Sequence, residues 1–305
     1  MALESILKRA KYRRPFLIAI VLFICVLLLV RYFVLPPFSP SVKASMGEIS
    51  AKLLESLAVS LTITIGIGLF IYWLLPDLDE IAKVSVIDSS DIAKYLERAT
   101  DETDVWWYMG STGSYLRSHA LRGITAAAKK GGGGCHVIAL LLDPSNDGLC
   151  GEFARYRNSL KSQKPIAWTT KEIKIEILAT ILSALTTKER QPQIRVDIGL
   201  RQTFSTLRYD VSSKHVIITK EESDAPAIRC DAPGQYYKAY RDEVNFAFNQ
   251  AREVSPPRGF AVLLDADRVK QLLEESLKID LSDLDEKDIG EIIERARERR
   301  DRHEN

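Results

Sequence analysis

The apolar positions of this sequence are spread unevenly, with two long apolar runs in its first quarter. The first covers residues 15–35, where Arg31 is the single charged residue, and the second covers residues 56–75, which hold none. A membrane-spanning helix needs about 20 mainly apolar residues, so both runs are long enough. A cleaved signal peptide is the alternative for the first run, but the run is too long and no small-residue cleavage site follows it. The pattern predicts a basic segment over residues 1–14 and a transmembrane hairpin over residues 15–76.

Charge indicates how such a hairpin would be oriented. Residues 1–76 carry eight basic and three acidic side chains, and the rest of the chain carries 34 and 38. Five of the basic residues precede the first run, and the positive-inside rule then places both termini in the cytoplasm. The formal net charge of +1 therefore averages a basic hairpin and a mildly acidic remainder. This balance excludes a generally basic nucleic-acid-binding domain.

Small residues recur along the second apolar run. Ser60, Thr64 and Gly68 are four residues apart, which places them on one face of a helix. Small residues let helices approach closely, and hydroxyl groups can form hydrogen bonds between helices. We expect this face to pack against the first run of the same chain or against a second copy in a homo-oligomer.

Beyond residue 76 the pattern changes to short apolar runs that alternate with longer amphipathic stretches. Residues 84–88, 105–109 and 137–142 are predicted strands, separated by predicted helices. The further predicted helices are 89–98, 115–130, 150–160, 170–187 and 235–252, and the further predicted strands are 194–197, 207–211, 216–219 and 259–264. The alternation predicts a mixed, mainly parallel α/β domain over residues 77–280.

Residues 281–305 form a charged C-terminal helix in this interpretation. Glu291 and Arg295, like Glu298 and Arg302, have the i,i+4 spacing of helical ion pairs. We expect a solvent-exposed helix, with a docking segment for a partner protein as the alternative.

The sharpest local motif lies between the predicted strand 105–109 and the helix that follows. The motif is a glycine- and hydroxyl-rich turn with an arginine one turn later, made of Gly110, Ser111, Thr112, Gly113, Ser114 and Arg117. Free N–H groups at a helix start, together with hydroxyls and a guanidinium, suit a phosphate group. The motif predicts a phosphate-binding loop, with an ordinary helix cap as the alternative.

A second candidate is the predicted strand that begins at His215 and ends at Lys220. The two residues are five positions apart, so they point to opposite faces of a strand, which argues against a joint catalytic pair. The four histidines and four cysteines show no metal-ligand spacing. We therefore predict no metal and no cofactor.

Three stretches, residues 106–117, 137–157 and 207–240, resemble the phospholipase D-like family. Active members of that family carry His-x-Lys followed by Asp, with the histidine attacking phosphorus. Here His215 is followed by Val216 and Ile217, so the lysine is missing at the required offset. The resemblance implies a degenerate, non-catalytic domain; if the chain is an enzyme, His215 and Lys220 are the candidate catalytic residues.

The predicted architecture, two spans followed by such a domain, is similar to two-transmembrane effectors of bacterial antiphage systems of the retron type. That similarity implies a toxin that perturbs the inner membrane, with a cytoplasmic domain that acts as a sensor or docking module. The implied partners are inner-membrane lipid, further copies of the chain, and defence-system proteins such as a reverse transcriptase with its nucleic acid. The alternatives are an anchored phosphodiesterase or nuclease that uses His215 and the Gly110–Ser114 loop, and an anchored binding module without toxicity.

Overall fold

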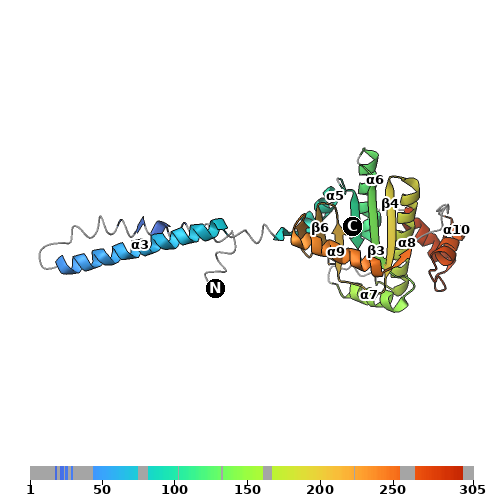
Figure 1. Ribbon diagram of the computed structural model, residues 1–305. Coiled ribbons are helices and arrows are strands. Elements are labelled where there is room, and N and C mark those ends of the chain that lie inside the picture. The colour runs from blue at the N-terminus through green and yellow to red at the C-terminus, as the bar shows by residue number, and fades with distance from the viewer. Residues whose placement is uncertain are drawn as a thin grey trace. The chain divides into compact units, whose positions relative to one another are not determined.

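The computed structural model describes residues 18, 21–23, 25–26, 29, 44–74, 82–101, 103–131, 133–160, 167–222, 224–254 and 265–297. The chain divides into two compact units, residues 1–82 and residues 83–305. Figure 1 labels the main elements of both units.

The first unit contains the long helix α3 (Ala44–Leu74), which includes nearly all of the second apolar run. On this helix the Thr64 hydroxyl donates to the Ser60 carbonyl at 2.9 Å. The Thr64 hydroxyl is therefore bonded within its own helix. Packing of the face formed by Ser60, Thr64 and Gly68 against another helix stays a prediction.

Over the residues that the structure describes, no helix combines the length and the apolar character needed to cross a membrane. This finding contradicts the predicted transmembrane hairpin, with spans at 15–35 and 56–75, and the predicted inner-membrane localisation. It also removes the two-span architecture on which the similarity to retron-type effectors rested. Most of residues 15–35 lie outside the described residues, and the seven residues that are described there are helical.

The second unit is built around one eight-stranded sheet with the order β1-β7-β6-β5-β2-β3-β4-β8. Its strands are β1 (Val84–Ile87), β2 (Val105–Met109), β3 (Cys135–Leu142), β4 (Ile194–Arg201), β5 (Leu207–Val211), β6 (His215–Lys220), β7 (Ala227–Asp231) and β8 (Arg252–Val254). The strands predicted from the sequence for β1 to β6 are confirmed within a few residues. β7 and β8 were not predicted, and the predicted strand at 259–264 lies outside the described residues.

The pairing of these strands corrects the predicted mainly parallel sheet. β2 pairs with β3 and β3 pairs with β4 in parallel. The other five neighbouring pairs in the described sheet are antiparallel. The reason lies in the connections: β5, β6 and β7 follow one another through short turns, which return the chain antiparallel, whereas a parallel pair needs a long crossover.

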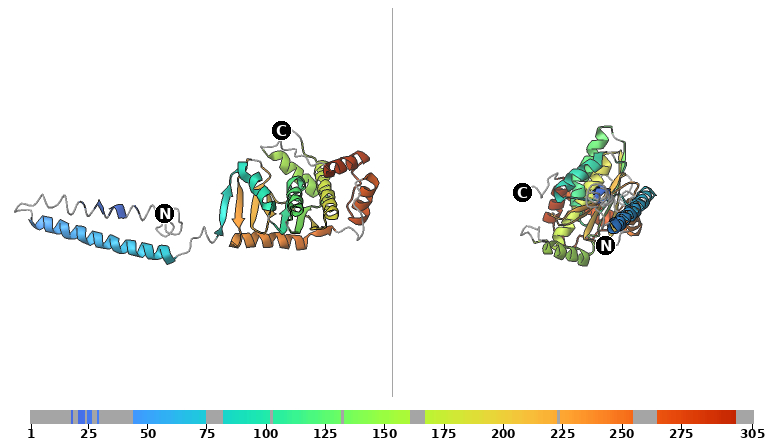
Figure 2. Two further views of the ribbon diagram at one scale, coloured as in Figure 1. Left: turned by 90° about the horizontal axis from the view of Figure 1, so that it is seen from above. Right: turned by 90° about the vertical axis from the view of Figure 1, so that its left-hand side faces the viewer.

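Helices cover both faces of the sheet. The α-helices are α5 (Ile92–Asp101), α6 (Leu121–Lys129), α7 (Asp147–Ser159), α8 (Thr170–Arg190), α9 (Gln235–Gln250), α10 (Ala266–Gln271) and α11 (Glu286–Arg297). Shorter segments are the 3₁₀-helix η3 (Ser89–Asp91) and the π-helical turns η4 (Leu116–Ala120) and η5 (Leu272–Ser276). Figure 2 shows α9 along one face and α5 to α8 on the opposite face.

Each face has its own hydrophobic core. The larger cluster lies under α5 to α8 and includes the fully buried Trp106 of β2 and Phe153 of α7. The smaller one lies under α9, where Tyr237 and Val244 pack against strands from β2 to β7. Apolar side chains on alternate strand positions therefore bury both faces of the sheet.

The turns that follow the parallel strands lie together at one edge of the sheet, at the carboxyl ends of those strands. β2, β3 and β4 all end at this edge, here named the carboxyl edge, and β6 runs in the same direction. The turns Gly110–Ser114, Asp143–Asn146 and 202–206 therefore lie at the same end of the sheet. In open α/β sheets this end is the usual place for a ligand.

Candidate functional site

The predicted phosphate-binding loop leaves β2 at the carboxyl edge and stays hydrogen-bonded to β3. The N–H of Gly110 donates to the Leu140 carbonyl at 3.1 Å, and the Leu142 N–H donates to the Ser111 carbonyl at 3.0 Å. Ser111 is buried. These bonds hold the first half of the loop in line with the sheet, so the turn into the helix is made in the second half.

Gly113 makes that turn. Its φ is +75°, and its carbonyl accepts a hydrogen bond from the Arg117 N–H at 2.9 Å. A Cβ atom at this position would lie 2.6 Å from Thr180 Cγ2 and 2.7 Å from Leu141 Cδ2. Glycine is therefore required here both by the backbone conformation and by the space beneath α8.

The side chains that were predicted to bind phosphate meet a carboxylate of the protein itself. Ser114 Oγ donates to Glu176 Oε2 at 3.0 Å, and Arg117 Nη2 donates to the same oxygen at 2.7 Å. Thr112 Oγ1 lies 2.9 Å from Ser114 Oγ and extends this cluster. The carboxylate of Glu176, on α8, thus accepts the hydrogen bonds that the loop was predicted to donate to phosphate.

The second oxygen of Glu176 links the loop to the C-terminal helix. Arg295 Nη1, on α11, donates to Glu176 Oε1 at 2.7 Å, and Arg295 Nη2 donates to Glu172 at 2.7 Å and also to Glu291. Burial raises the pKa of Glu176, but Arg117 and Arg295 outweigh it, so the pKa is lowered. The carboxylate is therefore held in its charged form.

The expectation of a solvent-exposed C-terminal helix is wrong for α11. Ile289, Ile292 and Ile293 are buried, and so is Arg295. The predicted ion pair between Glu291 and Arg295 is present, within a buried network rather than on the surface. The second predicted pair, Glu298 with Arg302, lies outside the described residues.

Two arginines from other strands contact this segment, one at Gly110 and the other at Tyr115. Arg201, at the end of β4, is 8% exposed and donates through Nη2 to the Gly110 carbonyl at 2.8 Å. Arg208, on β5, donates through Nε to Asp210 at 2.8 Å, and its guanidinium lies 4.6 Å from the centre of the Tyr115 ring. Sequence reasoning missed both arginines, because neither belongs to a local motif.

The electrostatics of these two arginines differ. Burial lowers the pKa of Arg201. Burial also acts to lower the pKa of Arg208, but Asp210 outweighs it and the pKa is raised. Burial raises the pKa of Asp210, an effect that Arg208 only partly offsets. Arg208 thus forms an ion pair with a carboxylate, whereas the Arg201 guanidinium donates a hydrogen bond to a backbone carbonyl.

The structure separates His215 from the loop. His215 begins β6 and pairs with Asp231 of β7, at the edge opposite to Gly110. Lys220 ends the same strand, and five residues of a strand span about 16 Å. Burial lowers the pKa of His215, helped by the nearby Arg229. His215 and the Gly110–Ser114 loop are therefore not brought together as one site.

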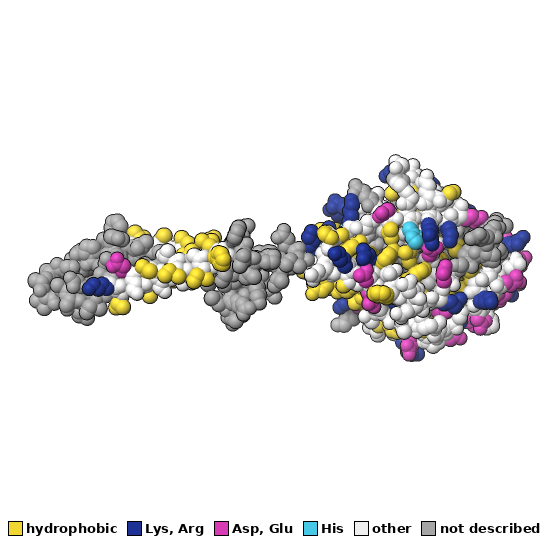
Figure 3. Space-filling view, in the orientation of Figure 1, with side chains coloured by type: hydrophobic (Ala, Val, Ile, Leu, Met, Phe, Trp, Pro, Cys, Tyr) yellow, Lys and Arg dark blue, Asp and Glu magenta, His cyan; other side chains and the backbone are white. Residues whose placement is uncertain are grey.

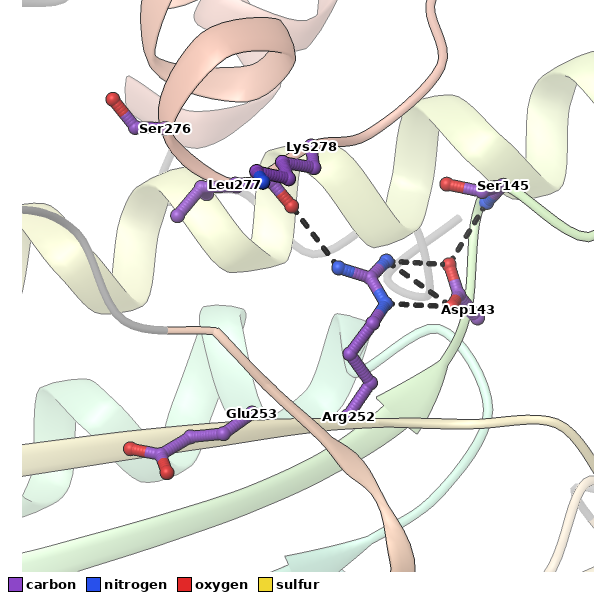
Figure 4. Close-up of a pocket in the computed structure, with 7 residues that line it drawn as sticks. All are labelled: Asp143, Ser145, Arg252, Glu253, Ser276, Leu277 and Lys278. Carbon is purple, nitrogen blue, oxygen red and sulfur yellow. Dashed lines mark hydrogen bonds and ion pairs between the residues drawn. The ribbon is translucent and has the colours of Figure 1, made fainter.

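A cavity of about 530 Å³ opens beside the turn after β3 (Figure 4). Asp143 and Arg252 form its floor, with Arg252 Nη2 3.0 Å from Asp143 Oδ1 and Arg252 Nη1 donating to the Leu277 carbonyl at 3.0 Å. Asp143 also accepts from the Ser145 N–H at 3.0 Å and from Gln202 Nε2 at 2.9 Å. The charges of Asp143 and Arg252 therefore neutralise each other.

The described surface agrees with a chain without a dominant charge. On the face drawn in Figure 3, acidic and basic side chains of the α/β unit are interspersed. Among the described residues, no group of three or more His, Cys, Asp or Glu side chains is placed to hold a metal ion.

The sequence matches no protein-family model and no curated protein. Two solved structures are distantly similar in fold. One is TrmBL2, an archaeal chromatin protein with a novel mode of DNA binding, at 10% identity and a TM-score of 0.34, over 70% of this chain and 73% of that one. The other is Nuc from Salmonella typhimurium, a phospholipase D family member, at 12% identity and a TM-score of 0.34, over 56% of this chain and 96% of that one. At this distance neither similarity supports an argument about function.

Proposed function

We propose that the α/β unit is a non-catalytic sensor module, in which the Gly110–Arg117 loop exchanges the Glu176 carboxylate for an oxyanion ligand of the phosphate type. The observation that carries the proposal is that Ser114 and Arg117 both bind one oxygen of Glu176, at 3.0 and 2.7 Å. The same donors can hold a phosphate oxygen, because charge-assisted bonds of this kind serve carboxylates and phosphates alike. Glu176 is then an internal competitor of the ligand.

The exchange would be transmitted to α11. Glu176 binds Arg295 through its second oxygen, so a ligand that displaces Glu176 removes one of the three carboxylates around Arg295. A buried charge that loses an oppositely charged partner destabilises the arrangement that keeps it buried. The attachment of α11 to α8 through Arg295 is weakened in consequence, and α11 becomes available to dock on a partner protein.

The test uses the full chain titrated with inorganic phosphate, with calorimetry for binding and hydrogen exchange for α11. Glu176→Gln removes the competing charge, and we expect phosphate affinity to rise about 5- to 150-fold, the usual range of a coupling between sites. Arg117→Gln should lose binding at the loop. Glu172→Gln is the matched comparison, because it takes another carboxylate from Arg295 without touching the loop; it should loosen α11 and, since the coupling is reciprocal, raise phosphate affinity by less than Glu176→Gln does. Equal affinity in the wild-type chain and Glu176→Gln would contradict the proposal.

The non-catalytic part of the proposal has its own assay. The separation of His215 from the loop supports a binding role, and we expect the full chain not to hydrolyse bis(p-nitrophenyl) phosphate. Hydrolysis that disappears in His215→Ala would favour a phosphodiesterase instead.

A further inference from the structure

Arg201 is a buried cation whose charge no described carboxylate neutralises. Its side chain is more than nine-tenths buried, and its hydrogen bond among the described residues goes to the Gly110 carbonyl at 2.8 Å. Its Nε atom is buried without a hydrogen-bond partner in the same part of the chain. A buried charge without a counter-charge is destabilising, so its presence at the carboxyl edge needs an explanation.

The nearby carboxylates are bound to other cations. Asp143 follows β3 next to the end of β4, but both of its oxygens bind Arg252, and it also accepts from Ser145 and Gln202. Asp210 binds Arg208 through Oδ2 at 2.8 Å, and its Oδ1 is buried without a hydrogen-bond partner among the described residues. Neither carboxylate forms an ion pair with Arg201 among the described residues, and an external anion can take that role.

Two further donors lie around the same glycine. A Cβ atom on Gly110 would overlap the Tyr108 hydroxyl, so that hydroxyl lies directly over the Gly110 backbone. Burial raises the pKa of the Tyr108 hydroxyl. Arg208 and Arg201 are near enough to act against this rise, whereas Asp210 and Glu221 add to it. Arg208 uses Nε for Asp210, and its two terminal nitrogens have no hydrogen-bond partner among the described residues. Donors from three strands, β2, β4 and β5, thus surround Gly110.

We infer that Arg201, Arg208 and Tyr108 form a binding site for a phosphate-class oxyanion at Gly110, separate from the pair of donors at Ser114 and Arg117. Guanidinium groups are suited to phosphate, because they present several N–H donors in a fixed plane. Donors that approach from three strands match the several oxygens of a tetrahedral anion better than the two coplanar oxygens of a carboxylate. The inference goes beyond the proposed function, since it does not require Glu176 to leave the loop.

The experiment compares Arg201→Met with Arg201→Lys in the full chain. Binding of inorganic phosphate, glycerol 3-phosphate and acetate is measured by calorimetry, and stability is measured by urea denaturation. We expect Arg201→Met to bind phosphate about tenfold or more weakly, because a charged hydrogen-bond donor is lost, while Arg201→Lys keeps part of the affinity. Without ligand, Arg201→Met should be at least as stable as the wild-type chain, because an unpaired buried charge is replaced by an apolar side chain.

The outcomes separate this inference from the proposed function. Phosphate binding that survives Arg117→Gln and is lost in Arg201→Met supports the site at Gly110. Binding that is lost in Arg117→Gln and unaffected by Arg201→Met overturns the inference and leaves the proposed function standing. Acetate binding as tight as phosphate binding overturns the ligand class. A large loss of stability in Arg201→Met would assign Arg201 a structural role and overturn the inference.

Discussion

At the scale of single residues, Gly110 carries the tightest steric constraint of the site. An added Cβ atom would overlap the Tyr108 hydroxyl. We predict that Gly110→Ala lowers the free energy of unfolding by about 1–3 kcal/mol, the usual cost of overpacking, as measured by urea denaturation. Gly133→Ala is the control, because an added Cβ there meets nothing within 4 Å. If the two variants are equally stable, the close approach of Tyr108 to Gly110 is wrong.

His215 gives a second prediction at this scale. Burial lowers its folded-state pKa below the usual value of 6.5. The neutral form is therefore favoured in the folded protein, so this contribution to stability is present above about pH 6.5 and is lost as the pH falls through the lowered pKa. We expect the free energy of unfolding to fall less steeply with decreasing pH in His215→Gln than in the wild-type chain. Identical pH profiles would contradict the burial of the imidazole.

At the scale of elements, Glu176 joins α8 to α11 through Arg295. The pKa of Glu176 is lowered below 4.5, so the stabilisation it gives is present above about pH 4.5 and lost as the pH falls below that value. We predict that the protection of α11 against hydrogen exchange falls at acidic pH before that of the central strands does. In Glu176→Gln, α11 should already exchange fast at neutral pH, and slow exchange there would rule out Glu176 as the link.

The elements also show what could be predicted from the sequence. The apolar run at 137–142 identified β3, because a strand buried on both faces needs continuous apolar residues. β7 was missed because Arg229 interrupts its short pattern. β8 was missed because three residues show no period, and its first residue, Arg252, was assigned to the end of α9. The direction of pairing was wrong, because turn length and not apolar pattern decides whether a strand returns antiparallel.

At the scale of the whole molecule, the candidate site combines one continuous segment with single residues that are distant from it in the sequence. The Gly110–Ser114 loop was found because its residues are consecutive. Glu176, Arg201 and Arg208 come from α8, β4 and β5, and only the sheet brings them to the same edge. A single sequence carries no signal for such contacts, since a lone charged residue in a helix or strand resembles any exposed one.

The division of the chain into two units leads to a final prediction. All described buried residues of both hydrophobic cores lie between Ile87 and Ile293, within the unit that starts at residue 83. We therefore expect a fragment of residues 83–305 to unfold cooperatively in urea, because it keeps every described core residue. A fragment of residues 92–305 lacks β1 and the buried Ile87, so its β7 loses an antiparallel partner. Its free energy of unfolding should be lower by about 2–5 kcal/mol, the usual cost of losing one large buried aliphatic side chain. Failure of the 83–305 fragment to fold, with a full chain that folds, would show that residues 1–82 contribute to the stability of the α/β unit.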